Sequence, residues 1–294
     1  MKNSLLHPSS FRLHPSLSPD FVVIGHLTRD EQADGSFTLG GAATFASITA
    51  RELGYRVGIL TSAAADYPEP QLLHDIEIVR IPSPTTTTFR NLYHDNTRTQ
   101  YVRDIAAPIR ATDVPAGWRD AKIVLLGPLA GEIDGAMMNV FSPNTTLAVS
   151  PQGWMRKWDA MGRVKPRAWS EAVDILPRAS VLIQSDEDLG PFAERLSSYV
   201  ALAPVVIMTL GVNGCTIYQK SKRPLEVPAF PTKVVDLTGA GDSFAAGFLI
   251  RYYETGDLLQ AARFGNATAS LAIESAGAET MPTRAQVEAR LKRG

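Results

Sequence analysis

Short apolar runs alternate along the chain with segments whose apolar residues recur at helical spacing. Such runs, typical of buried parallel strands, occupy 21–24, 56–60, 76–81, 122–126, 146–149, 181–183 and 205–210. Helical spacing or helix-type boundaries mark 42–53, 136–141, the segment through Leu196 and Tyr199, 257–274 and 283–292. This alternation predicts an α/β fold with a mostly parallel central sheet and helices on both faces.

Two pairs of turn residues interrupt the alternation. Asp34-Gly35 and Asp95-Asn96 each lie between β-branched or aromatic residues, which is the pattern of a hairpin. We therefore expect a small β lid, built from about 30–39 and 85–104, that covers a pocket. Phe89 lies on this lid and is a candidate to line the pocket, although an aromatic residue in a strand also packs for purely structural reasons. The segment 154–164 has no clear period.

The N-terminal segment differs in composition from the rest. The tetrapeptide LHPS occurs at 6–9 and again at 13–16, among many Pro and Ser residues. We interpret 1–19 as a disordered extension. It lacks the continuous apolar core of a signal peptide, and no apolar run elsewhere is long enough to span a membrane.

Charge and cysteine content narrow the possible partners. The 294 residues include 29 Lys and Arg and 30 Asp and Glu, a formal net charge of −1, so neither nucleic acid nor an anionic membrane is expected as a partner. The single cysteine, Cys215, excludes an internal disulfide framework, and the five histidines show no zinc-ligand spacing. These features predict a cytoplasmic protein.

The stretch around Asp242 carries the clearest chemical signal. Val234-Val235 predicts a strand, Gly239-Ala240-Gly241 a tight turn, and the apolar residues after Asp242 a helix. The first N–H groups of a helix have no intrahelical partner, and the helix dipole adds partial positive charge, so an anion such as a phosphate is favoured there. Asp242 itself is suited either to cap the helix or to accept a proton.

Common nucleotide-binding and catalytic motifs are absent. The chain has no G-x-x-x-x-G-K-[ST], and in the G-x-G of the glycine turn Phe244 replaces the third glycine of a dinucleotide fingerprint. Neither G-x-S-x-G nor the kinase H-R-D motif occurs.

The stretch DLTGAGDSFAAGF resembles the signature of the ribokinase-like carbohydrate kinases, the pfkB family. Further matches follow in the family's order over about 21–280: Gly25 to Asp30, Gly40-Gly41, VVIMTLGVNGCTIY and FGNATASLAIESAG. The resemblance implies a ribokinase-like domain over 20–294. It also implies transfer of the γ-phosphoryl group of ATP, with Mg²⁺, to a hydroxyl of a small molecule.

The resemblance also assigns roles to individual residues. Asp242 matches the catalytic base, and Gly239, Ala240 and Gly241 match the anion hole. Backbone N–H groups supply that charge stabilisation without reorganising. Other matching positions concern ligands: Asp30 for acceptor hydroxyls, Gly40 and Gly41 beside the acceptor, Thr209, Gly211 and Gly214 beside the nucleotide, Asn266 near the adenine, and Asp236 at a monovalent cation site that would hold K⁺.

Two positions depart from the family pattern. The magnesium element N-x-x-E is Ser185-Asp186-Glu187-Asp188 here, so Asp188 or Glu187 must hold Mg²⁺ through water. Ribokinase has an asparagine where this chain has Phe45, which cannot hydrogen-bond a sugar. The pattern GGAATFAS is closer to the myo-inositol kinase-like branch, in which Gln152 and Arg156 are candidate acceptor contacts; alternatively, both are surface polar groups.

Three functions remain open at this point. The first is an ATP-dependent kinase of a small polyol or sugar, inositol-like or a hexose. The second is a nucleoside kinase, in which Phe45, Phe89 and Tyr93 would stack on a base, and the third is a catalytically silent sugar- or nucleotide-binding protein. The family's lids cover a pocket alone or pair between subunits, so a homodimer is one of two expected arrangements.

Overall fold

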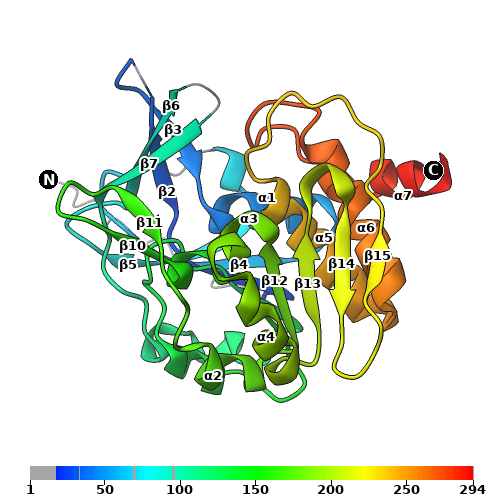
Figure 1. Cartoon of the computed structure of the whole chain (residues 1–294). Coiled ribbons are helices and arrows are strands. Elements are labelled where there is room, and N and C mark those ends of the chain that lie inside the picture. The colour runs from blue at the N-terminus through cyan, green and yellow to red at the C-terminus, as the bar shows by residue number, and fades with distance from the viewer. Residues whose placement is uncertain (1–17, 33, 69–70, 95–96, 294) are drawn as a thin grey trace, which may run out of the picture.

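A computed structural model describes residues 18–32, 34–68, 71–94 and 97–293, so most of the expected extension at 1–19 lies outside the described residues. A nine-stranded sheet forms the centre of the fold (Figure 1). Its strands in spatial order are β15 (Leu225–Val227), β14 (Cys215–Tyr218), β13 (Val206–Thr209), β12 (Val181–Ser185), β9 (Thr146–Val149), β8 (Ile123–Leu126), β1 (Phe21–Ile24), β4 (Val57–Ala63) and β5 (Ile76–Pro82). The strands from β13 to β5 are parallel to one another, whereas β14 runs antiparallel to β13 and β15 runs antiparallel to β14. The predicted α/β fold with a mostly parallel sheet is confirmed.

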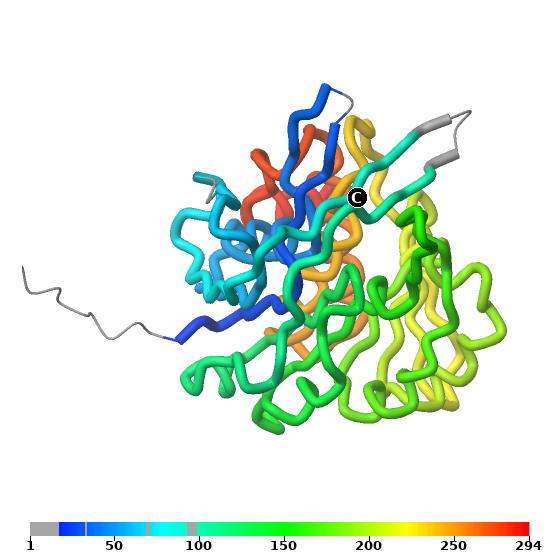
Figure 2. Tube along the Cα trace, turned by 90° about the vertical axis from the view of Figure 1, so that its left-hand side faces the viewer, coloured from blue at the N-terminus to red at the C-terminus, as the bar shows by residue number. Residues whose placement is uncertain are grey.

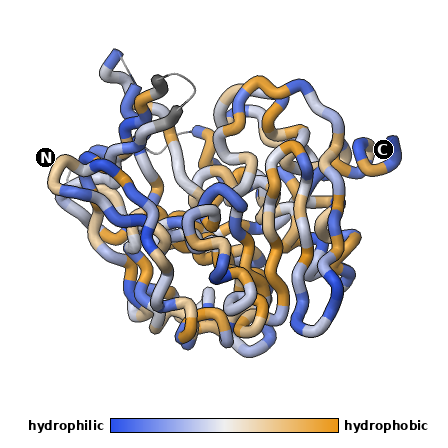
Figure 3. Tube along the Cα trace, viewed as in Figure 1, coloured by the Kyte–Doolittle hydropathy of each residue, from blue (hydrophilic) through white to orange (hydrophobic). Residues whose placement is uncertain are grey.

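Helices cover both faces of this sheet. One face carries the longer helices α1 (Ala42–Glu52), α5 (Ala240–Thr255), α6 (Leu258–Ala272) and α7 (Arg284–Arg293). The other face carries short helices and 3₁₀ turns, including α2 (Ala172–Ile175), α4 (Leu196–Leu202), η3 (Ala116–Trp118), η4 (Gly135–Asn139) and η6 (Leu176–Arg178). Because successive strand residues face opposite sides, Val23 packs in the first layer and Val22 in the second. Both faces are therefore apolar, as the hydropathy colouring in Figure 3 shows for the central strands.

A second, four-stranded sheet stands at the carboxyl ends of the central strands (Figures 1 and 2). This lid sheet has the order β3 (Phe37–Gly40), β2 (Thr28–Glu31), β6 (Thr88–His94) and β7 (Thr97–Asp104). The pairs β2–β3 and β6–β7 are antiparallel and β2–β6 is parallel. Residues 95–96 of the second expected turn lie outside the described residues. The apolar residues Phe89, Val102 and Leu129 form a cluster that joins the lid to the loop after β8.

Two local expectations are wrong. The segment 136–141 does not form an α-helix, because only the 3₁₀ helix η4 forms there, capped by the Asp134 carboxylate. Val234 and Val235 do not form a strand. They are 47% and 54% exposed, and the Val235 N–H donates to the carbonyl of Ile273 instead of to a neighbouring strand.

The aperiodic segment after β9 is structured. It begins with η5 (Gln152–Met155) and continues as a hairpin of β10 (Arg156–Trp158) and β11 (Val164–Pro166). The tip of this hairpin reaches the lid, where the Val102 N–H donates to the Gly162 carbonyl at 2.8 Å. Gly162 has a φ of +79°, and a Cβ there would lie 2.3 Å from the Val102 oxygen, so only glycine permits this contact.

The remaining helical segments are connectors. The short helix α3 (Asp186–Leu189) follows β12 directly and leads into η7 (Gly190–Arg195). The 3₁₀ helices η1 (Gln71–Leu73), η2 (Ala111–Asp113) and η8 (Gly211–Asn213) occupy loops between strands. Among the helices of the described ranges, none combines the length and apolar content that crossing a membrane requires.

A buried carboxylate fixes the loops at the carboxyl ends of β1 and β8. Glu132 is 4% exposed, and its side chain accepts hydrogen bonds from the N–H groups of His26, Leu129 and Ala130, at 3.0, 2.9 and 2.7 Å. The His26 ring lies beside it, with Nδ1 2.6 Å from the hydroxyl of Thr87, next to the lid strand β6. One carboxylate thus ties two strand-end loops together beneath the lid.

We expect Glu132→Gln to destabilise the fold. The glutamine NH₂ would face backbone N–H donors, so at least one hydrogen bond to a charged group would be lost in a site without solvent, at a cost of about 2 to 4 kcal/mol. Urea unfolding of Glu132→Gln measures this loss. Glu279→Gln, at an exposed carboxylate, serves as the control and should change the free energy of unfolding by less than about 0.5 kcal/mol. Equal effects of the two substitutions would contradict the role given to Glu132.

Candidate active site

The glycine turn before α5 is shaped by direct contact with an aromatic ring. Gly239 precedes the helix with a φ of +76°, a left-handed conformation that favours glycine. A Cβ at Gly239 would lie 2.2 Å from Cδ1 of Phe45, so the ring packs directly on the glycine backbone. Phe45 is 2% exposed and belongs to α1, the helix that begins after Gly41. Sequence-distant residues therefore fix the conformation of this turn.

The turn presents open backbone donors. The Ala240 N–H donates to the carbonyl of Leu237 at 3.2 Å, whereas the N–H groups of Gly241 and Asp242 have no backbone acceptor within the described chain. An added Cβ at Gly241 would meet no atom within 4 Å. Open donors, the positive end of the α5 dipole and free space together make an anion site.

Asp242 lies in the first turn of α5, partly exposed, beside a second carboxylate and a guanidinium. Burial and, to a smaller extent, the negative charge of Asp188 raise the pKa of Asp242 to about 6, against the opposing positive charge of Arg156. A carboxyl group with this pKa is ionised at neutral pH and remains basic enough to accept a proton from a hydroxyl in a transition state.

Asp188 brings another candidate residue into the same cluster. Gln152 donates from Nε2 to the Asp188 carboxylate at 3.2 Å, and the Ser185 hydroxyl donates to it at 3.0 Å. Gln152 and Arg156 come from the segment after β9, Asp188 from the short helix α3 after β12, and Asp242 from α5. The carboxyl ends of adjacent parallel strands and one helix start thus meet at a single point, as expected for a ligand site in an α/β sheet.

The residues at this point suit Mg²⁺ bound largely through water and phosphate. Asp188 faces the cluster, whereas Glu187 is exposed. No group of three His, Cys, Asp or Glu side chains suited to a metal occurs among the residues described. Mg²⁺ commonly takes one or two carboxylates and completes its shell with water and substrate phosphates. The carboxylates of Asp188 and Asp242 repel each other, and a bound cation would reduce this repulsion.

Asp236 lies just before the glycine turn and is held by backbone donors. Its carboxylate accepts from the N–H groups of Thr238 at 2.9 Å and Gly277 at 3.1 Å. Partial burial raises the pKa of Asp236, but these hydrogen bonds outweigh burial and leave it lowered. Asp236 therefore stays ionised and joins the segment before α5 to the loop after α6. Its proposed K⁺ role stays a prediction.

The acceptor-side candidates lie between β2 and the start of α1. A Cβ on Gly40 would lie 2.5 Å from Oδ2 of Asp30, so the carboxylate reaches that backbone closely. Gly41 precedes α1 with a φ of +92°, close to the Leu129 side chain. Phe89 is only 4% exposed and packs under the lid with Val102 and Leu129. Phe45 is buried against Gly239, so in this conformation neither ring presents a face to solvent.

The donor-side candidates surround the loop after β13. Gly211 has a φ of +53° and open space around it, and Gly214 packs so tightly that a Cβ would lie 2.2 Å from the carbonyl oxygen of Val227. Asn266 is 6% exposed and donates to the carbonyls of Val227 and Pro228. Thr209 ends β13, and its hydroxyl points toward the carbonyl of Gln184. Asn266 thus fixes the segment that borders the Gly211 loop.

Two residues of this region were not singled out from the sequence. Glu132 follows Gly127-Pro128, and the signal that could have identified it is a lone carboxylate after the end of an apolar strand. Trp158 lies next to Arg156 on β10, in a segment without a clear period. Its only sequence signal is a large aromatic residue among charged ones.

The chain is similar in sequence to known proteins. Residues 156–284 match the pfkB family carbohydrate kinase model. A cytidine kinase of Thermococcus kodakarensis is 29% identical over 84% of this chain and 93% of its own length. An inositol 3-kinase of Arabidopsis thaliana is also 29% identical, over 82% of this chain and 69% of its own.

Solved structures share the fold. A pyrophosphate-dependent ribokinase-family kinase, in complex with a pyrophosphate analog and myo-inositol, superposes with a TM-score of 0.77 and 21% identity, covering 92% of this chain and 99% of that one. The nucleoside kinase of Methanocaldococcus jannaschii superposes with a TM-score of 0.71 and 22% identity over 94% of this chain and 99% of its own. Residues 156–284 are therefore similar to the pfkB family carbohydrate kinases, and the chain as a whole has the fold of the ribokinase-family structures.

Proposed function

We propose that this kinase transfers the γ-phosphoryl group of ATP to a hydroxyl of a small polyol or sugar, with Asp242 as the general base. The observation that carries the proposal is the position of the Asp242 carboxylate. It lies at a helix start with open N–H donors and has a pKa raised to about 6. A base and an anion site are thereby adjacent, as in-line phosphoryl transfer requires.

The proposed reaction assigns a task to each group. The acceptor hydroxyl attacks the γ-phosphorus while its proton passes to Asp242, so a new O–P bond forms as the bond from γ-phosphorus to the β-phosphate oxygen breaks and ADP leaves. The N–H groups of Gly241 and Asp242 and the charge of Arg156 stabilise the negative charge on the transferring oxygens. Mg²⁺, when bound through Asp188 and water, neutralises phosphate charge. Asp30 would orient the acceptor through its hydroxyls.

The acceptor class remains the finer part of the proposal. Phe45 stands where ribokinase has an asparagine, which argues against ribose as the acceptor. A plant inositol 3-kinase is among the relatives that match most of this chain, which favours a polyol. A nucleoside kinase is the second candidate, because the cytidine kinase match extends over 93% of that enzyme. A mass-spectrometric screen of inositols, hexoses and nucleosides, with ATP and pyrophosphate supplied in parallel, decides between them. Product from nucleosides alone would overturn the polyol or sugar assignment.

Asp242→Asn should lower turnover and raise stability together. Loss of a general base costs about two or more orders of magnitude in kcat. The folded chain binds the Asp242 proton more tightly than the unfolded chain does, so the free energy of unfolding falls as pH rises from about 4 to about 6. At pH 7.5 the neutral asparagine avoids this loss, and with solvent screening we expect a gain of about 1 to 2 kcal/mol. Steady-state kinetics and urea unfolding measure the two effects.

The exposed residue Asp120 provides the control for this experiment. Asp120→Asn should change neither kcat nor the free energy of unfolding at pH 7.5. The stability gain of Asp242→Asn should also shrink at pH 5, where the wild-type carboxyl is largely protonated. An unchanged kcat in Asp242→Asn would sink the assignment of the base.

The pH profile of kcat/KM should report the charges around the base. We expect activity to rise with pH about an apparent pKa near 6 and then to level off. Arg156→Gln removes a positive charge that lowers the pKa of Asp242, so its midpoint should move to higher pH. Asp188→Asn removes a repelling negative charge and should move the midpoint to lower pH. Shifts in the reverse directions, or none, would contradict the charge cluster.

Two glycine substitutions separate the anion site from the fold. Gly241→Ala places a methyl in open space, so stability should hold while KM for ATP rises, because the methyl obstructs close approach of the phosphates. Gly239→Ala creates a clash with Phe45 and a strained φ, and it should cost more than about 1 kcal/mol of stability. Thermal unfolding and ATP titration check both. An unchanged KM for ATP in Gly241→Ala would rule out phosphate contact at that backbone.

A further inference from the structure

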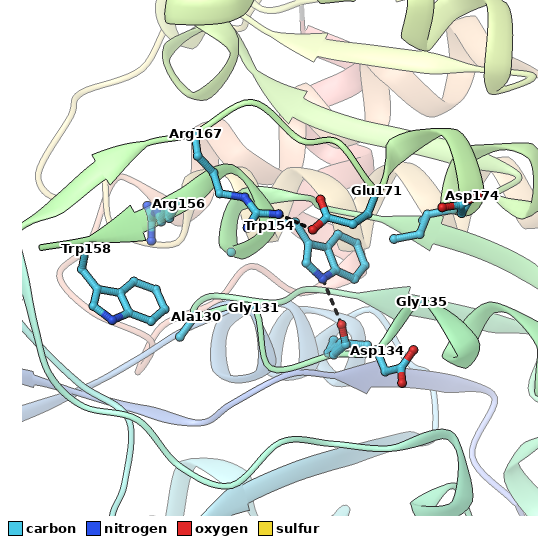
Figure 4. A pocket seen from close by; sticks show the side chains of 13 residues that line it. Ala130, Gly131, Asp134, Gly135, Trp154, Arg156, Trp158, Arg167, Glu171 and Asp174 are labelled. Carbon is cyan, nitrogen blue, oxygen red and sulfur yellow. Dashed lines mark hydrogen bonds and ion pairs between the residues drawn. The ribbon is translucent and has the colours of Figure 1, made fainter.

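A pocket of about 470 Å³ lies beside the Asp242 cluster, between the β10–β11 hairpin and the loop after β8 (Figure 4). Its walls include Gly131, Trp154, Arg156, Trp158, Arg167 and Glu171, and we call it the side pocket. Neither Asp242 nor Asp30 lines it. Its volume falls within the range of about 300 to 1,000 Å³ typical of small-molecule sites.

Arg156 connects the side pocket to the cluster that contains Asp188 and Asp242. It lines the side pocket, and its charge also lowers the pKa of Asp242. Gly153, next to Gln152, lines the pocket as well and packs so closely on the β8 loop that a Cβ would lie 2.5 Å from the Leu129 nitrogen. A molecule held at Asp242 therefore has the side pocket as its neighbour, with Arg156 at the boundary.

Two tryptophans give the side pocket flat apolar walls. Trp154 is fixed, because its Nε1 donates to the Ile133 carbonyl at 2.9 Å and its ring stacks on Trp169 at 5.4 Å. Trp158 is 38% exposed and lies at the other end of the same space (Figure 4). An exposed indole beside a preorganised one is suited to stack on a ring-shaped ligand.

The charges around the side pocket argue against an anionic ligand. The wall of the side pocket contains Arg156 and Arg167 together with three carboxylates, those of Asp134, Glu171 and Asp174. Arg167 already forms an ion pair with Glu171. The net charge of the wall is therefore not positive, and phosphate would not be preferred there. The polar groups suit hydroxyls or the edge of a heterocycle, since both donors and acceptors are present.

We propose that the side pocket binds a second, uncharged ring that the acceptor carries through a glycosidic bond, while the ring to be phosphorylated lies at Asp242. This inference rests on the proposed function. The second ring has one flat apolar face for Trp158 and a hydrogen-bonding edge for the Arg167–Glu171 pair. A sugar ring and a nucleobase share this chemistry. With a polyol or sugar as the reacting ring, the natural acceptor is accordingly a glycoside, larger than a free hexose or inositol; for the second candidate function, the same space would hold the base of a nucleoside.

Matched pairs of acceptors test the proposal on the full chain. Each pair shares the reacting ring: ribose with cytidine and adenosine, myo-inositol with its galactoside, and glucose with maltose. We expect at least one two-ring acceptor to show a kcat/KM about tenfold or more above its one-ring partner, the gain that one stacked ring can supply. The nucleoside and glycoside pairs identify which second ring is used.

Substitutions at Trp158 locate the second ring. Trp158→Ala should raise KM for the preferred two-ring acceptor about tenfold and leave KM for its one-ring partner unchanged, and Trp158→Phe should restore most of the loss. Met161→Ala is the matched control, because Met161 lies on the same hairpin, is 79% exposed, and does not line the side pocket. A Trp158→Ala effect equal for both acceptors would overturn the proposal.

The possible results separate this inference from the proposed function. Efficient phosphorylation of one-ring acceptors with no gain for any two-ring partner overturns the side pocket and leaves the kinase assignment intact. If no acceptor at all is phosphorylated, the proposed function fails, and calorimetry with the two-ring compounds then decides. Binding heat that Trp158→Ala abolishes supports the side pocket, and the absence of heat overturns it.

Discussion

The contact between the Phe45 ring and the backbone of Gly239 is the constraint on which the site depends. It needs a glycine in a left-handed conformation on one side and a fully buried aromatic ring on the other. Because Phe45 lies on α1, which begins at the acceptor-side glycines, the contact sets α1 against α5. The acceptor side and the anion side are thereby held in one fixed relation, as chemistry between two bound molecules requires.

The charges around the start of α5 lower the stability of the fold when no ligand is bound. Two carboxylates, Asp188 and Asp242, face each other with one guanidinium nearby, and burial adds to the penalty on ionising Asp242. Groups arranged in this way are costly in the absence of ligand and are typical of functional sites. Gln152 and Ser185 hold Asp188 in place despite this repulsion. Two uncharged donors thus fix the position of the Asp188 carboxylate.

Much of the fold could be predicted from the sequence, because strands buried on both faces leave apolar runs such as Phe21–Ile24. The strand predicted at Val234-Val235 was wrong for a physical reason. The pair has the composition of a strand, but no strand lies beside it, and the Val235 N–H donates to the Ile273 carbonyl instead. The cluster of Gln152, Arg156, Asp188 and Asp242 came largely from family resemblance, since nothing in the spacing brings these residues together. Glu132 could not be predicted, because its partners are backbone groups, one of them 106 residues away.

The hydrogen bond between Val102 and Gly162 links the position of the lid to the acidity of the base. The same hairpin that contacts the lid at Gly162 begins at Arg156, whose charge lowers the pKa of Asp242. A displacement of this hairpin would change the distance between guanidinium and carboxylate, and by Coulomb's law the proton affinity of Asp242 would change with it. With the guanidinium farther away, Asp242 would hold a proton for a larger fraction of the time.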